Sequence, residues 1–173
     1  MTSYGDTWLP PGHRAPMTGG TGTASGRATA HHRPGQGPGA GTAFHRQTVL
    51  ELAPLPTAIP CFRLHTAAVL TEWGLPRDLI RDAELLVSEL MTNACDASAV
   101  LPERPPIALR LLGSGRSVVI EAWDQSPLDL EPREAGDDDE CGRGLTVIAA
   151  LSTRWGCERT GYRRKVVWAE IAL

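Results

Sequence analysis

The chain has 173 residues, of which 42% are hydrophobic and 21% are charged, and its formal net charge at pH 7 is −3. This length allows one ordinary domain with some chain left over, and the negative charge disfavours a general binder of nucleic-acid phosphates, which needs a basic excess. No apolar run approaches the length that spans a bilayer, and the first residues lack the features of a signal peptide. We therefore expect a cytoplasmic protein that binds neither nucleic acid directly nor a membrane.

The N-terminal segment, residues 1–43, differs in composition from the rest of the chain. It contains ten of the 18 glycines and five of the 14 prolines, but a single acidic residue, Asp6. Such a segment buries too little apolar surface to offset the entropy lost on ordering. We expect a disordered tail over residues 1–43 and one folded domain over residues 44–173.

From Phe44 onward the sequence alternates between strand and helix patterns. Pro60 suits the first turn of a helix that Gly74 ends, and Asp78 suits the start of a longer second helix. Gly113-Ser114-Gly115 is a turn signal between two strands. The patterns predict strands at 47–52, 107–112, 117–123, 154–159 and 165–171, and helices at 60–73, 76–98 and 145–152.

The predicted order is β-α-α-β-β-loop-α-β-β. Because each helix is apolar on one side only, it must cover a sheet. The strand at 117–123 also alternates, with Val118, Ile120 and Ala122 pointing to one face. We expect an α+β fold, a two-layer sandwich in which three helices cover one face of a mixed, mostly antiparallel sheet.

The four cysteines, Cys61, Cys95, Cys141 and Cys157, are scattered without a Cys-x-x-Cys spacing. Two disulfides or a zinc site are the alternatives to free thiols. Because Cys61 and Cys95 fall in predicted helices, we favour free thiols in a reducing cytoplasm.

The second predicted helix carries polar residues beside its apolar stripe. Glu89, Asn93 and Asp96 lie on the flank of its leucine and alanine face. A half-buried amide must find partners, so a helix built for packing alone would not place Asn93 there. An amide oxygen is a suitable Mg²⁺ ligand, and Glu89 one turn earlier can accept a proton from a hydroxyl or water. The alternative is a solvated carboxylate and amide on a helix flank.

A second polar segment, residues 123–127, follows a predicted strand. A carboxylate such as Asp124 at a strand end can accept a hydrogen bond from an exocyclic amine, for example that of adenine. The alternative is an ordinary Asp-Ser-Pro turn.

A third segment, residues 142–145, opens the last predicted helix. Its two glycines allow the backbone to approach a ligand, and free N–H groups at a helix start favour phosphate. The preceding residues 128–141 hold seven acids and one arginine and can form a solvated, mobile lid. The alternative is a flexible loop that leads into a helix.

In this order and spacing, the three segments resemble the nucleotide-binding boxes of the GHKL superfamily, the histidine kinase-like ATPases with the Bergerat fold. Within that superfamily they are most similar to anti-sigma-factor serine/threonine kinases and their small actinomycete relatives. Residues 88–94 match the N box, residues 123–127 the adenine-binding box and residues 142–145 the phosphate-loop box. Residues 151–156 and 166–171 resemble the closing hairpin, so the resemblance covers about residues 47–172.

The resemblance implies a site for ATP and Mg²⁺. Glu89 matches the catalytic base, Asn93 the Mg²⁺ ligand and Asp124 the adenine contact. The other nucleotide contacts that it implies are Asp96, Ser126, Gly142, Arg143, Gly144 and Leu145. Ser126 stands where many members have glycine.

The implied activity is transfer of the ATP γ-phosphoryl group to a serine of an antagonist protein, coupled to control of a sigma factor. The implied partners are that antagonist, the sigma factor, or both, and homodimers are common in the family. An alternative is a nucleotide-gated interaction module with little or no catalysis, because Cys141 replaces a phosphate-loop glycine. Two further alternatives are slow ATP hydrolysis without a protein substrate and a small domain that binds no nucleotide.

Overall fold

The computed structural model describes residues 43–126, 140–159 and 164–173, without the side chains of residues 140–143. The predicted tail, apart from Ala43, lies outside the described residues, and so does the acidic segment as far as Asp139.

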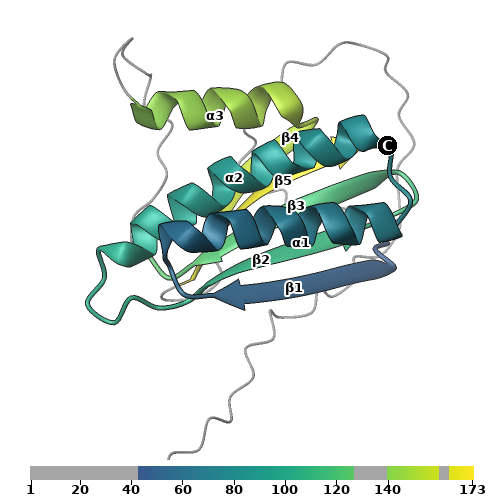
Figure 1. Cartoon of the computed structure of the whole chain (residues 1–173). Coiled ribbons are helices and arrows are strands. Elements are labelled where there is room, and N and C mark those ends of the chain that lie inside the picture. Colours follow the sequence, from purple (N-terminus) through teal and green to yellow (C-terminus); the bar gives the residue numbers. More distant parts are fainter. Residues whose placement is uncertain (1–42, 127–139, 160–163) are drawn as a thin grey trace, which may run out of the picture.

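The described residues contain the predicted strands and helices in the predicted order (Figure 1). The strands are β1 (Arg46–Leu52), β2 (Ile107–Gly113), β3 (Ser117–Asp124), β4 (Arg154–Arg159) and β5 (Lys165–Ala172), and the helices are η1 (Pro56–Ala58, a 3-10 turn), α1 (Ile59–Glu72), α2 (Arg77–Ala99) and α3 (Glu140–Leu151). Their boundaries agree with the prediction to within about one residue, except that α3 begins at Glu140 and not at Leu145. Among the described helices, none is long and apolar enough to cross a membrane.

The strands form one sheet in the order β1-β2-β3-β5-β4, with the helices on one face (Figure 1). Every pair of neighbouring described strands is antiparallel, where the sequence predicted a mixed, mostly antiparallel sheet. The α+β two-layer class is confirmed.

The main core lies between the sheet and α2. This helix buries Leu86 and Leu90 against Leu109 and Ile120 of the sheet, and Ile148 of α3 belongs to the same cluster. Helix α1 packs beside α2, because the chain reverses sharply between them. Gly74 adopts a φ of 80°, and the Leu75 N–H donates to the Leu70 carbonyl at 3.0 Å, which ends α1.

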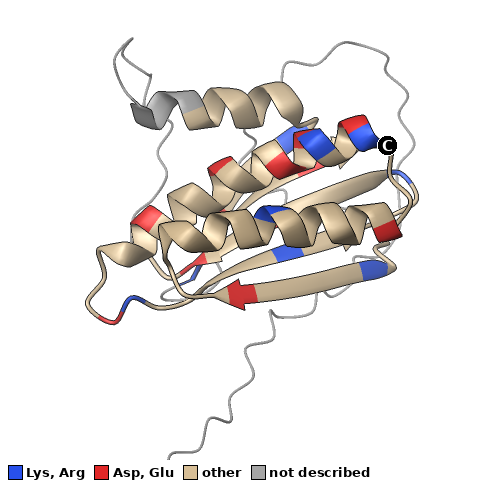
Figure 2. Ribbon diagram, in the orientation of Figure 1, with Lys and Arg blue, Asp and Glu red and all other residues tan. Residues whose placement is uncertain are grey.

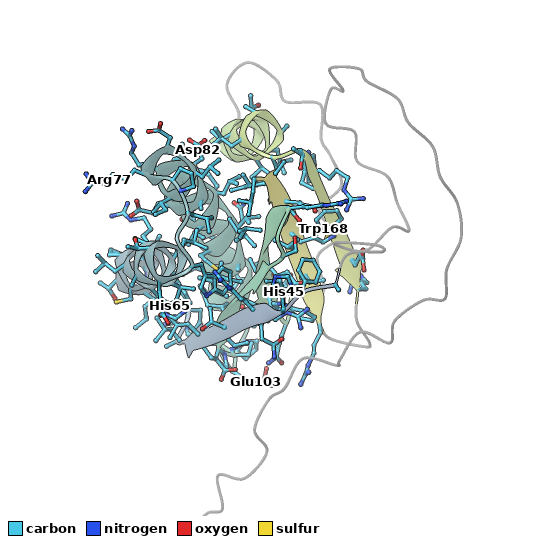
Figure 3. All side chains as sticks on the ribbon, turned by 90° about the vertical axis from the view of Figure 1, so that its right-hand side faces the viewer. His45, His65, Arg77, Asp82, Glu103 and Trp168 are labelled. Carbon is cyan, nitrogen blue, oxygen red and sulfur yellow. The ribbon has the colours of Figure 1, made fainter. Side chains whose placement is uncertain are left out.

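The opposite face of the sheet carries aromatic and paired charged side chains. Arg110 donates to both carboxylate oxygens of Glu121, at 2.6 and 2.9 Å, and Trp123 donates to the same carboxylate at 2.8 Å. Trp168 lies on this side of the sheet, away from the helices, and His65 lies on the helix side (Figure 3). The charges on this face are therefore neutralised within the sheet itself.

One end of the molecule collects the three polar segments. The start of β2 pairs with the end of β3, since Ala108 lies opposite Trp123, and Lys165 at the start of β5 lies opposite Asp124. Figure 1 shows the start of α3 and the C-terminal part of α2 at this same end. The fold thus brings segments that are distant in sequence to one edge of the sandwich.

Candidate functional site

Two of the polar segments approach each other where α2 lies beside α3. Glu89 and Asn93 are half-buried on α2, and Gly144 is buried on α3. A Cβ atom at position 144 would lie 3.0 Å from Glu89 Oε2 and 3.8 Å from Asn93 Nδ2. The backbone of α3 therefore faces the carboxylate and the amide directly, and any side chain at position 144 would press on Glu89.

Helix α3 begins earlier than predicted and already contains the glycine segment. Gly142 and Arg143 lie in its first turn, although their side chains are not described. Glycine disfavours a helix interior by about 1 kcal/mol relative to alanine, which is why the segment suggested a loop. Burial of Gly144 and Ile148 against α2 and the core offsets that preference. Backbone N–H groups without intrahelical partners belong to the beginning of a helix, so the segment lies at the end that suits an anion.

The remaining charge pattern of the two helices is simple. The described part of α3, residues 144–151, contains no charged residue, whereas α2 carries both signs (Figure 2). The carboxylate of Glu89 on α2 therefore lies against a part of α3 whose described side chains are uncharged.

Asp124 lies in a second polar cluster with Ser126 and Lys165. Its Oδ1 accepts the Ser126 N–H at 2.7 Å, and its Oδ2 lies 3.3 Å from Lys165 Nζ. Lys165 Nζ also donates to Ser126 Oγ at 3.0 Å. The side chains of Asp124 and Lys165 are 1% and 4% exposed, so this is a buried ion pair.

Lys165 has no role in the site that the sequence predicts. The lysine begins an apolar strand, where a charged residue is typical of a solvated strand end. The signal that identifies it is strand register, because Lys165 pairs with Asp124 in the β3–β5 ladder. Register between strands so far apart in the chain is not encoded in any local pattern.

The other predicted contacts have different surroundings. Asp96 is exposed on α2 next to the buried Cys95, and burial, followed by the Asp96 charge, raises the pKa of the Cys95 thiol. Leu145 is half-buried and packs against the main core. The thiols of Cys61 and Cys95 are free, as predicted, and the Cys141 side chain lies outside the description.

A pocket of about 260 Å³ lies beside Asp124. Its described lining is Glu51, Pro106, Ala108, Trp123, Asp124, Gln125 and Arg164. Glu89 and Asn93 do not line it, so the structure joins the polar segments in two groups, Glu89–Asn93–Gly144 and Asp124–Ser126–Lys165.

The first group fits a magnesium site that is completed by a ligand. The described residues contain no cluster of three or more His, Cys, Asp or Glu side chains that could enclose a metal ion by themselves. Mg²⁺ commonly takes one or two protein oxygens and completes its shell with phosphates and water. The Asn93 amide, with the Glu89 carboxylate and the start of α3 beside it, is compatible with that arrangement.

Comparisons with known proteins find similar sequences and a similar fold. The family model described as the histidine kinase-like ATPase domain matches residues 52–171. An uncharacterized protein from Streptomyces coelicolor is 36% identical over 83 residues, which are 46% of this chain and 76% of that protein. A chain in the crystal structure of the SiaB-SiaC complex from Pseudomonas aeruginosa matches with a TM-score of 0.53 and 12% identity, over 72% of this chain and 88% of that chain. At this identity the structural likeness concerns the fold alone.

Proposed function

Because this chain belongs to the histidine kinase-like ATPase domain family, we propose that it binds Mg²⁺ and ATP and transfers the γ-phosphoryl group to a serine of an antagonist protein. The observation that carries this proposal is the approach of Gly144 to both Glu89 and Asn93. This contact joins a carboxylate, a side-chain amide and the start of a helix, which are groups that phosphoryl transfer can use.

In the proposed reaction Glu89 is the base. Its carboxylate accepts the proton of the serine hydroxyl as that oxygen bonds to the γ-phosphorus and the bond to the ADP oxygen breaks. Half-burial of Glu89 between α2 and α3 supports this role, because it limits the positions that the carboxylate can adopt.

The amide oxygen of Asn93 would hold Mg²⁺, which when bound neutralises charge on phosphate oxygens. The N–H groups at the start of α3, with Gly142, Arg143 and Gly144, would stabilise the phosphates. Arg143 supplies a positive charge next to the acidic segment that precedes it in sequence. Asp96, Ser126 and Leu145 complete the proposed nucleotide contacts.

A protein partner is part of the proposal. The structural neighbour was solved as a complex of two proteins, which supports a partner such as an antagonist-like protein here. We extend this to control of a sigma factor, in line with the resemblance of the three boxes to anti-sigma-factor kinases. The free thiols of Cys61 and Cys95 support a reducing, cytoplasmic location.

A second candidate is a nucleotide-gated interaction module without catalysis. One observation favours it: the glycine segment is already helical in α3, whereas a mobile phosphate loop would have to wrap around the transferred group. In that case ATP binding would change the surface offered to a partner, and Glu89 would have no chemical role.

Transfer of labelled γ-phosphate to a candidate antagonist separates the two functions. We expect Glu89→Gln to abolish transfer while ATP binding persists, since only the base is lost. Glu84→Gln is the matched control, because Glu84 lies on the same helix outside the proposed site. Transfer that survives in Glu89→Gln would refute the role of the base, and absence of transfer by the wild type to antagonist proteins would favour the interaction module.

A further inference from the structure

The carboxylate proposed to contact adenine is not isolated in the structure, because a buried lysine holds it. Lys165 Nζ lies 3.3 Å from Asp124 Oδ2 and donates to Ser126 Oγ at 3.0 Å, while the Ser126 N–H donates to Asp124 Oδ1 at 2.7 Å. The three residues close a ring that ties the end of β3 to the start of β5. The ring fixes both the position and the orientation of the carboxylate.

A second buried ion pair in the same sheet provides a comparison. Glu121 receives two hydrogen bonds from Arg110 and one from Trp123, so both of its oxygens are occupied in the middle of a strand. Among the described residues, Asp124 accepts one hydrogen bond on Oδ1, from the Ser126 N–H, and has the Lys165 ammonium 3.3 Å from Oδ2. A carboxylate has roughly four acceptor positions, so Asp124 keeps capacity for a further donor.

The surroundings of Asp124 also distinguish it from a purely structural residue. It lies at the end of β3 and lines the pocket of about 260 Å³, next to Trp123 and Gln125. A buried carboxylate needs a cation or hydrogen-bond donors beside it. Lys165 and the Ser126 N–H supply these, so Asp124 is a fixed acceptor at the wall of a pocket.

We infer that Lys165 is a positioning residue for base recognition: it holds the Asp124 carboxylate in place and oriented to accept a hydrogen bond from the exocyclic amine of adenine. The inference rests on the proposed nucleotide-binding function. Lys165 acts through Asp124. Its loss should therefore weaken the hydrogen bond to the adenine amine more than the contacts to the ribose and triphosphate.

The test compares ATP with inosine triphosphate, which carries a carbonyl where adenine has the amine. Calorimetry in the presence of Mg²⁺ measures the affinity of both nucleotides for the wild type, Lys165→Gln and Lys165→Met. A hydrogen bond to a charged group predicts that the wild type prefers ATP by about 10- to 100-fold. In both variants we expect this preference to fall to about 3-fold or less, mainly through weaker ATP binding.

Lys165→Gln is included because it retains a hydrogen-bond donor and so folds more readily than Lys165→Met, which leaves Asp124 and Ser126 without their partner. Arg154→Met is the control for loss of a cation paired with β5, since Arg154 binds Glu170. It should leave the preference for ATP unchanged, even if the melting temperature falls.

The outcomes separate the inference from the proposed function. If folded Lys165→Gln keeps the preference for ATP, the ion pair of Lys165 has a structural role only. That result would overturn the inference but leave the proposed nucleotide binding intact. Equal wild-type affinity for both nucleotides would overturn it as well, because Asp124 would then not read the amine. Failure of the wild type to bind either nucleotide would refute the proposed function itself.

Discussion

The backbone of Gly144 lies against the carboxylate of Glu89, and a Cβ atom at position 144 would lie 3.0 Å from Glu89 Oε2. This contact joins two segments that are separated by the whole of β2 and β3 in the sequence. The absence of a side chain at Gly144 therefore leaves room for the carboxylate of the proposed base in the position that it occupies.

Gly144→Ala should therefore change the stability of the protein little while it lowers the rate of phosphoryl transfer. Alanine is a better helix former than glycine by about 1 kcal/mol, so the free energy of unfolding should change by no more than about that amount. The new methyl group displaces the Glu89 carboxylate, and phosphoryl transfer should fall by about tenfold or more, as expected for a misplaced catalytic group.

Urea unfolding and the rate of labelled-phosphate transfer measure the two quantities. Gly115→Ala is the control, because no atom lies within 4 Å of a Cβ atom at that turn position. A folded Gly144→Ala protein with the wild-type transfer rate would show that the Glu89 carboxylate need not stay where the structure has it.

The buried pair of Asp124 and Lys165 predicts strong coupling in stability. Asp124→Asn or Lys165→Met alone breaks this buried ion pair by removing one of its two charges and should lower the free energy of unfolding by about 3–5 kcal/mol. The double variant removes both charges, so its loss should be clearly smaller than the sum of the two single losses.

Urea unfolding of the wild type, the two single variants and the double variant measures this coupling as a double-mutant cycle. Additive losses would show that the two charges do not interact in solution. The same comparison explains why Asp124→Asn alone is a poor test of adenine binding, since it breaks the ion pair with Lys165 as well as removing the acceptor.

Stability should also depend on the protonation of His65. Burial lowers the pKa of His65 from its ordinary value of 6.5, so the unfolded chain binds a proton there more readily than the folded protein. Stability is therefore complete above about pH 6.5 and falls as the pH drops below that value. Its ring nitrogen Nε2 lies 3.3 Å from Thr48 Oγ1 of β1, so protonation affects the α1–β1 contact.

Melting temperatures of wild type and His65→Gln between pH 7.5 and about 5 measure this effect. The variant should lose less stability than the wild type over that interval, and His45→Gln, at an exposed position, should follow the wild type. Parallel curves for His65→Gln and the wild type would contradict the prediction.

Most of the architecture follows from local sequence patterns. Gly74 ends α1, the Gly113–Gly115 turn joins β2 to β3, and the one-sided apolar stripe of α2 covers the sheet, each as predicted. These features depend on residues within a few positions of one another, which is why the sequence alone predicts them.

The features that the sequence did not predict depend on long-range contacts. Helix α3 starts at Glu140 because Gly144 and Ile148 find partners on α2, and this packing overrides the low helix propensity of the glycines. Lys165 joins Asp124 because β3 and β5 pair in one register. Glu89, Asn93 and Asp124 were identified from their positions, but the division of the site into two groups required the tertiary structure.

Binding of Mg²⁺ and ATP by the native protein is the central claim, and thermal melting tests it most directly. A ligand that binds only the folded state adds about 2.7 kcal/mol of stability at a free concentration a hundredfold above its Kd. For a domain of this size that corresponds to a rise in Tm of roughly 10 °C. We expect such a rise with ATP and Mg²⁺ together, and a smaller one with ATP and EDTA or in Asn93→Ala. A Tm that stays unchanged at millimolar ATP with Mg²⁺ would contradict the account.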